Sequence, residues 1–240
     1  MTNNTKPIKD AEENEQSKKT TEAPTQQIVD LGSTVTRTPH GLIHCLTIVG
    51  QIEGHMQAAQ GAKTTKYEHV MPLLVGLEEN EEIAGVLFLL NTVGGDVEAG
   101  LGIAELIAGM SKPTVSLVLG GSHSIGVPLA VAAKTSFAVP SAAMTIHPVR
   151  MSGTVIAAPQ TYQYFDRLQD RIVDFVVKNS GITKKKFLEL MMKTDEMASD
   201  VGSVIYGKEA VSLKLIDRVG GLSDALEELY GQIDRRREEK

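Results

Sequence analysis

The chain has 240 residues, of which 42% are hydrophobic and 22% are charged, and its formal net charge is −6. Most of it is therefore a folding, globular sequence. The acidic charge argues against binding to a phosphate backbone, and with 4% aromatic residues and no Trp the chain is poor in side chains that stack on bases. We expect no nucleic-acid partner.

Cys45 is the only cysteine, which excludes an intramolecular disulfide and a multi-cysteine metal site. No apolar run approaches the roughly 20 residues of a membrane-spanning helix, and the start of the chain lacks the pattern of a signal peptide. We therefore expect a cytoplasmic protein without membrane insertion.

The two ends of the chain differ from the rest in composition. Residues 1–28 are almost wholly polar and predict a disordered tail. One ordered domain is expected over 29–230, followed by a charged C-terminal tail over 231–240. Its arginines, Arg235 to Arg237, are expected at a solvated helix end because Glu238 and Glu239 dilute them.

Between these ends, apolar runs typical of strands alternate with helical periods, which predicts an α/β fold with mainly parallel strands. The expected strands are 43–49, 86–90, 114–119, 136–139 and 144–146. The expected helices are 67–77 (despite Pro72), 99–110, 124–133, 159–178 and a further one capped by Thr183. The ring-rich helix 159–178 either completes its own core or contacts another subunit, and both interpretations stay open.

Two glycine-rich turns are expected at the carboxyl ends of strands, where α/β proteins build their sites. In the segment Asn91 to Asp96, paired glycines let backbone N–H groups face an anion or a developing oxyanion, although such a pair is equally ordinary turn chemistry. In the segment Gly120 to Gly126, a serine is placed either as a nucleophile or as a helix N-cap. His123 is interpreted as a neighbour of that serine. His147 ends a short apolar strand and is either a general base or a half-buried structural histidine.

Three segments together resemble the Clp protease proteolytic subunit family: Leu87 to Gly100 (LFLLNTVGGDVEAG), Gly120 to Gly126 (GGSHSIG) and Thr145 to Pro148 (TIHP). The likeness extends over about 43–222. It implies a fold of repeated ββα units, shared with the crotonase family, and a protruding handle helix. It also implies a homo-oligomeric ring that hydrolyses extended polypeptides as a serine endopeptidase.

Carried onto this chain, the resemblance makes Ser124 the nucleophile and His147 the general base. The N–H groups of Gly94 and Ile125 would form the oxyanion hole, and Gly95 would begin the edge that holds an extended peptide. No cofactor or metal is implied. Whether an ATP-driven unfoldase partner is required stays open, because the polar tail is longer than the axial loops of the family.

The acidic member of the triad is where this chain departs from the family. Aligned without a gap, the aspartate position falls on Gly202. Asp200 is the preferred candidate, and Asp195 is a poorer one. The acid orients the histidine while the nucleophile and base perform the chemistry, so a displaced acid predicts a slower hydrolase.

Two other function classes remain. The first is an acyl-CoA hydratase or isomerase of the crotonase fold, although its chemistry usually relies on carboxylates where this chain has Ser124 and His147. The second is a non-catalytic ring scaffold, which the uncertain aspartate suggests.

Overall fold

The computed structural model describes residues 32–151, 153–195 and 201–239. The strands are β1 (Ser33–Thr38), β2 (Gly41–Glu53), β3 (Thr64–Lys66), β4 (Ile83–Gly95), β5 (Thr114–Ser122), β6 (Thr135–Ala138), β7 (Ala143–Ile146), β8 (Ser203–Tyr206) and β9 (Arg218–Val219). The helices are α2 (Tyr67–Glu79), α3 (Val97–Gly109), α4 (Gly126–Val131), α5 (Ala158–Lys178), α6 (Lys184–Met191), α7 (Gly207–Ser212) and α8 (Leu222–Glu238).

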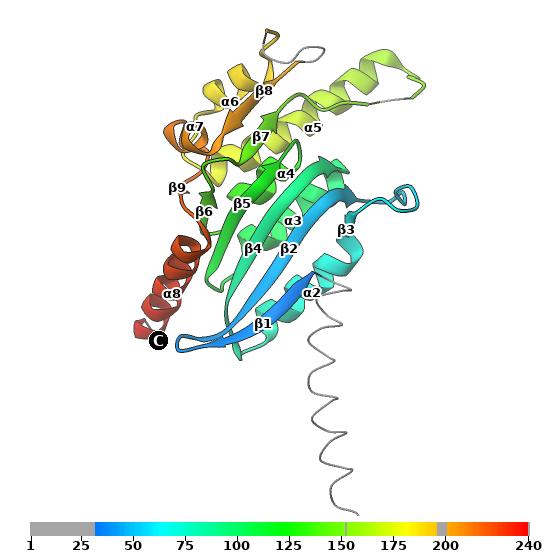
Figure 1. Cartoon of the computed structure of the whole chain (residues 1–240). Helices are drawn as coiled ribbons and strands as arrows, with labels where there is room; N and C mark the ends of the chain where they lie inside the picture. The colour runs from blue at the N-terminus through cyan, green and yellow to red at the C-terminus, as the bar shows by residue number, and fades with distance from the viewer. Residues whose placement is uncertain (1–31, 152, 196–200, 240) are drawn as a thin grey trace, which may run out of the picture.

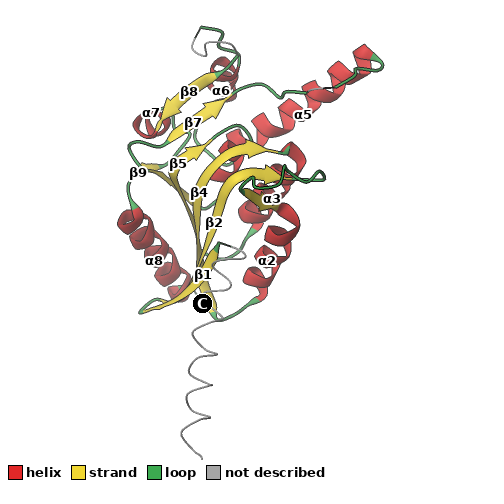
Figure 2. Cartoon of the chain, turned by 45° about the vertical axis from the view of Figure 1, so that its right-hand side comes forward, coloured by secondary structure: helices red, strands yellow, loops and turns green. Residues whose placement is uncertain are grey.

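The main sheet has the strand order β1-β2-β4-β5-β6-β9. Its strands run parallel from β2 to β9, and β1 pairs antiparallel with β2 at one edge. A smaller layer branches from β5, where β7 pairs parallel with β5 and antiparallel with β8. Helices α2 and α3 cover one face of the main sheet and α8 covers the other (Figure 2). The expected α/β arrangement of mainly parallel strands is confirmed.

Burial on both faces explains why β4 is apolar along most of its length. Val86 and Phe88 pack into the core under α2 and α3, whereas Leu87 points to the opposite face and packs with Leu229 of α8. A parallel strand covered on both sides carries a continuous apolar run instead of alternating polar residues. Packing on both faces therefore fixes the position of β4 and of its carboxyl end.

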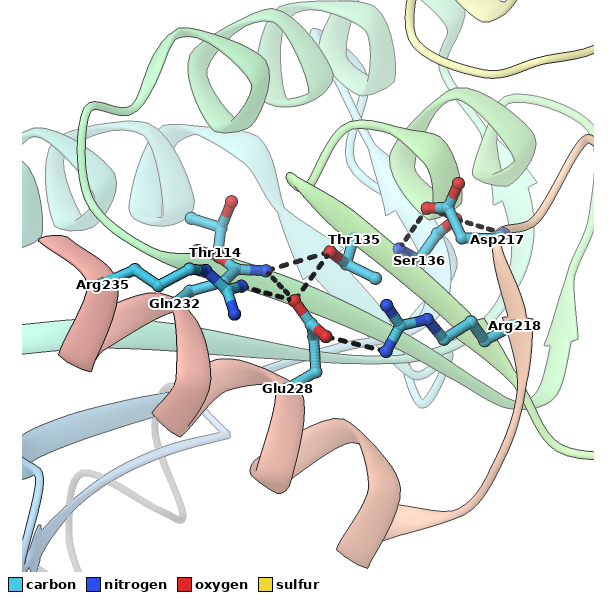
Figure 3. A network of polar contacts seen from close by, with 8 residues as sticks. All are labelled: Thr114, Thr135, Ser136, Asp217, Arg218, Glu228, Gln232 and Arg235. Atoms are coloured by element: carbon cyan, nitrogen blue, oxygen red, sulfur yellow. Dashed lines mark hydrogen bonds and ion pairs between the residues drawn. The ribbon is translucent and has the colours of Figure 1, made fainter.

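A polar network fastens α8 to the edge of the sheet (Figure 3). Glu228 of α8 accepts hydrogen bonds from Arg218 at 2.7 Å and from Arg235 at 3.1 Å. Asp217 accepts from both the N–H and the hydroxyl of Ser136 at 2.8 Å. The charge of segment 231–240 predicts a tail, whereas α8 continues through the segment to Glu238 and buries Ile233. The arginines lie in the last turn of this helix, as expected.

Helix α5 has two unlike halves. Its C-terminal half buries Leu168, Ile172 and Phe175 against the core. Its N-terminal half protrudes from the body of the molecule (Figure 1), where Tyr162 is 72% exposed. Phe165 is only half-buried in this protruding part. None of the helices within the described ranges is long and apolar enough to cross a membrane.

His44 on β2 is a buried polar residue without a hydrogen-bond partner among the described residues. It is 4% exposed, and neither of its ring nitrogens is bonded. Burial lowers the pKa of His44, because the charged imidazolium loses its hydration. An unsatisfied buried polar group of this kind costs about 1–3 kcal/mol of folding free energy.

We expect His44→Leu to raise the free energy of unfolding by about 1–2 kcal/mol near pH 7. In the wild type, stability should fall as the pH drops below the ordinary histidine pKa of 6.5 toward the lowered value, because the unfolded chain binds the proton more readily. In His44→Leu, this part of the pH dependence of the free energy of unfolding should be absent. Denaturant unfolding between pH 7.5 and 5 measures both effects, with His69→Leu at an exposed position of α2 as the control. A less stable His44→Leu protein would contradict this account.

Candidate active site

The candidate residues meet at the carboxyl ends of β4, β5 and β7. Residue Thr92 of β4 pairs with Ser122 of β5, and Gly121 pairs with Ala143 at the start of β7. Strand β4 continues into the first glycine-rich segment as far as Gly95, and β5 continues into the second as far as Ser122. The turns therefore begin later than the sequence indicated, because the backbone pairing continues through the glycines.

A pocket of about 120 Å³ opens at this edge. Ser124 and His147 both line it, together with Gly95 and Ile125. The remaining lining is mostly apolar and comes from the start of α3, the end of β7, the segment after β7, and α4, α5 and α6, including Pro128, Val149, Ile172, Phe187 and Met191. Ser124 and His147 thus share the lining of a small, mostly apolar space.

Ser124 sits on a tight turn between β5 and α4. Its φ of 57° is left-handed, a conformation that costs a residue with a Cβ about 1–2 kcal/mol. The turn is held by the Ser124 N–H, which donates to the Thr145 carbonyl at 2.8 Å. Ser122, the other serine of the segment, is fully buried, and its hydroxyl donates to the Gly126 carbonyl at 2.6 Å. Of the two hydroxyls, the one at Ser124 lines the pocket.

The backbone at Gly94 lies against the serine turn. A Cβ on Gly94 would stand 2.8 Å from Ser124 Cβ and 3.4 Å from the Ile125 nitrogen, and the residue has a φ of 86°. Its N–H donates to Thr92 Oγ1 at 3.0 Å, while that hydroxyl donates to the Gly50 carbonyl. To stabilise an oxyanion, the Gly94 N–H would therefore have to turn from Thr92 or be shared with it.

Gly95 joins the site to the neighbouring strand β2. It pairs with Ile52 in the parallel ladder, and a Cβ on Gly95 would stand 2.2 Å from the Ile52 carbonyl oxygen. Only glycine lets the two backbones approach this closely. Gly95 thus joins β2 to the lining of the pocket at the end of the sheet.

The imidazole of His147 is oriented by the main chain. Its Nδ1 lies 2.7 Å from the Pro148 carbonyl oxygen. A carbonyl oxygen only accepts, so Nδ1 carries the proton and Nε2 is the basic nitrogen. This is the tautomer that a general base needs when it removes a proton through Nε2.

Gly202 packs directly against His147. The antiparallel register of Ile146 with Ser203 brings the two residues opposite each other. A Cβ on Gly202 would stand 2.8 Å from His147 Cβ and 2.4 Å from the Ile146 carbonyl oxygen, and its φ is 136°. The position onto which the gapless alignment puts the acid is therefore next to the histidine, and it has no room for a side chain.

Only one of the other two acid candidates lies among the described residues. Asp200 lies outside the described residues. Asp195 is exposed and does not line the pocket. No group of three histidine, cysteine, aspartate or glutamate side chains within 32–151, 153–195 and 201–239 is arranged to hold a metal ion.

Sequence reasoning missed two residues that shape the site, Thr92 and Thr145. Each lies in a strand, where a single threonine gives no signal. Their importance arises from hydrogen bonds to the Gly94 N–H and the Ser124 N–H. The Thr92 bond is local to β4, whereas the Thr145 bond depends on β7 lying beside the serine turn, which no local pattern indicates.

A profile of the Clp protease family matches residues 41–222. The chain therefore belongs to the Clp protease family, and the fold class expected from the sequence is confirmed.

Among curated proteins, the chain is 54% identical to "Translocation-enhancing protein TepA" of Halalkalibacterium halodurans, over 88% of this chain and 82% of that protein. It is 26% identical to "ATP-dependent Clp protease proteolytic subunit 1" of Chlamydia muridarum, over 56% of this chain and 69% of that protein. The corresponding subunit of Protochlamydia amoebophila is 29% identical over 56% of this chain and 64% of its own length.

Proposed function

We propose that this protein is a cytoplasmic serine endopeptidase that hydrolyses extended polypeptides, with Ser124 as nucleophile and His147 as general base. The observation that carries the proposal is the shared pocket. Ser124 sits there on a left-handed turn, and His147 lines the same space in the tautomer with a basic Nε2. Membership of the Clp protease family supports this chemistry.

In the proposed reaction, His147 Nε2 takes the Ser124 proton as Oγ attacks the carbonyl carbon of the peptide bond. The Ile125 N–H, with the Gly94 N–H once it leaves Thr92, stabilises the oxyanion. The C–N bond then breaks, and the imidazolium gives the proton to the leaving amine. Water hydrolyses the acyl-enzyme by the same sequence, which regenerates the Ser124 hydroxyl.

The proposed acid is Asp200, which would stabilise the imidazolium. The Pro148 carbonyl already accepts the Nδ1 proton, so the orientation of the ring does not rest on a carboxylate alone. An acid at position 202 is excluded by the contact of Gly202 with the His147 backbone.

Assembly into a homo-oligomeric ring is part of the proposal. Tyr162 and Tyr164 on the protruding half of α5 are 72% and 53% exposed, and Ile156 just before that helix is 81% exposed. Such a concentration of exposed apolar side chains favours contact with another subunit over a solvated surface. The need for an ATP-driven unfoldase stays an open part of the proposal.

Two other functions are weaker. A hydratase or isomerase acting on acyl-CoA would need a carboxylate near the reacting carbon, and the described lining of the pocket contains neither Asp nor Glu. A non-catalytic ring component is favoured by one observation, the Gly94 N–H that donates to Thr92 instead of facing the pocket.

The test uses fluorogenic peptides that differ only in the residue before the scissile bond. We expect the leucine peptide to be cleaved at least about 10-fold faster than the lysine peptide, because a mostly apolar pocket favours an apolar side chain over an ammonium group that must lose its hydration. Light scattering on the same sample should give a multiple of the 25.8 kDa chain mass. Hydration of an enoyl-CoA without peptide cleavage would overturn the proposal in favour of the crotonase chemistry. Neither activity in a folded oligomer would favour the scaffold.

A further inference from the structure

His123 makes a specific contact that its place beside the nucleophile did not indicate. Its Nδ1 lies 2.8 Å from Thr145 Oγ1. The ring lies over Gly121, where a Cβ would stand 2.3 Å from Nε2 and 2.7 Å from Cδ2. The imidazole therefore occupies a slot that exists only because residue 121 is glycine.

Thr145 holds the serine turn at two points. Its carbonyl accepts the Ser124 N–H at 2.8 Å, and its hydroxyl bonds His123. Thr145 also lies on β7 just before His147. One threonine thus connects the turn that carries the nucleophile to β7, the strand that ends directly before the general base.

The turn needs such an anchor because Ser124 is strained. A left-handed residue with a Cβ persists only where its surroundings determine the conformation. The main chain of His123 contributes already, since its N–H donates to the Thr92 carbonyl at 3.1 Å and its carbonyl accepts from Gly126 at 2.9 Å. The side-chain bond to Thr145 adds the connection toward His147.

Burial lowers the pKa of His123, which favours the neutral ring. A threonine hydroxyl can donate to Nδ1 or accept from it, so the bond forms with either tautomer. His123 does not line the pocket. His123 therefore does not serve as a second base, and it can affect the reaction only by holding the turn that carries Ser124.

We propose that His123 is a positioning residue, whose bond to Thr145 holds the Ser124 turn in register with the strand of His147. This rests on the proposed peptidase function. Without the bond, the left-handed turn relaxes, and Ser124 Oγ spends less time within reach of His147 Nε2. The cost falls on acylation, since substrate binding uses the pocket and not the His123 slot.

The first test measures kcat and KM on the leucine peptide, and the rate at which a fluorophosphonate acylates Ser124. We expect His123→Ala and Thr145→Val each to lower kcat and the acylation rate about 10-fold with KM unchanged. The double variant should be no slower than either single one, because both remove the same bond. His123→Asn and Thr145→Ser, which keep a hydrogen-bonding group, should recover most of the rate. His69→Ala on α2 is the control.

The slot over Gly121 gives a second, independent test. Gly121→Ala should lower the acylation rate in the wild type, because its Cβ would displace the His123 ring. In the His123→Ala background the same change should have no effect, since the ring is absent. A merely structural role of Gly121 would instead lower the rate in both backgrounds.

The outcomes separate the two proposals. An active wild type whose His123→Ala variant keeps its rate, or in which the losses from His123→Ala and Thr145→Val simply multiply, overturns the positioning role alone. A rate loss accompanied by an equal rise of KM does the same. A folded wild type without hydrolysis and without an adduct on Ser124 overturns the peptidase function, and the positioning role with it.

Discussion

Ser124→Ala is expected to abolish both peptide hydrolysis and covalent labelling by a fluorophosphonate, with kcat reduced by about 10⁴-fold or more. Ser124 is the proposed nucleophile, and it shares the lining of the pocket with His147. Without it no acyl-enzyme can form, and water in the pocket is a poor substitute. The adduct, located by peptide mapping, should lie on Ser124 in the wild type.

Ser122→Ala is the matched control for this experiment. Its hydroxyl is buried and donates to the Gly126 carbonyl, so its loss should cost about 1 kcal/mol of stability and leave the adduct in place. His147→Ala should slow labelling, because the base is removed while the nucleophile remains. An adduct on Ser122, or a Ser124→Ala protein that still turns over, would contradict the assignment.

Gly202→Ala should lower kcat by about 100-fold, because its Cβ would push against the His147 backbone and move the imidazole by a fraction of an ångström or more. It should also destabilise the fold by about 1–3 kcal/mol, since φ is 136° and the contacted atoms, the Ile146 carbonyl oxygen and the Cα and Cβ of His147, cannot easily move away. Peptide hydrolysis and thermal unfolding measure the two effects separately.

Gly153→Ala provides the matched comparison. Its φ of 141° is close to that of Gly202, but a Cβ there would meet nothing within 4 Å. This variant carries the backbone strain without the collision, so it should lose stability and keep its rate. Equal losses of rate in the two variants would show that the contact with His147 does not matter.

The acid is tested by Asp200→Asn and Asp195→Asn. Because the Pro148 carbonyl already accepts the Nδ1 proton, we expect Asp200→Asn to slow hydrolysis only about 10-fold, compared with about 10⁴-fold where the acid alone sets the tautomer. Asp195 is exposed, and its variant should keep the wild-type rate. If neither variant loses rate, Asp200 is not the acid.

Individual strands and helices show how much of the fold the sequence predicts. The apolar runs 43–49, 86–90 and 114–119 lie within β2, β4 and β5, because strands buried on both faces must be apolar. The helix capped by Thr183 is present as α6, with the Thr183 hydroxyl accepting from the Lys186 N–H. The ends of β4 and β5 were missed, since glycines that usually mark turns here continue the pairing.

The sequence by itself predicted β2, β4, β5, β6 and β7 and the helices α2 to α6 in their order, the family, and the two residues proposed to perform the chemistry, whereas β1, β3, β8, β9 and α7 were not predicted. Local periodicity and short motifs carry that information. Only the tertiary structure decided the surroundings of those residues: Gly202 against His147, the Pro148 carbonyl on Nδ1, and the Thr145 contacts to the serine turn. The register between β7 and β8 and the pairing of β7 with β5 create these contacts. The composition argued against base stacking and excluded a disulfide within the chain, but only the fold placed exposed tyrosines on α5 and gave the pocket a mostly apolar lining that includes Phe187.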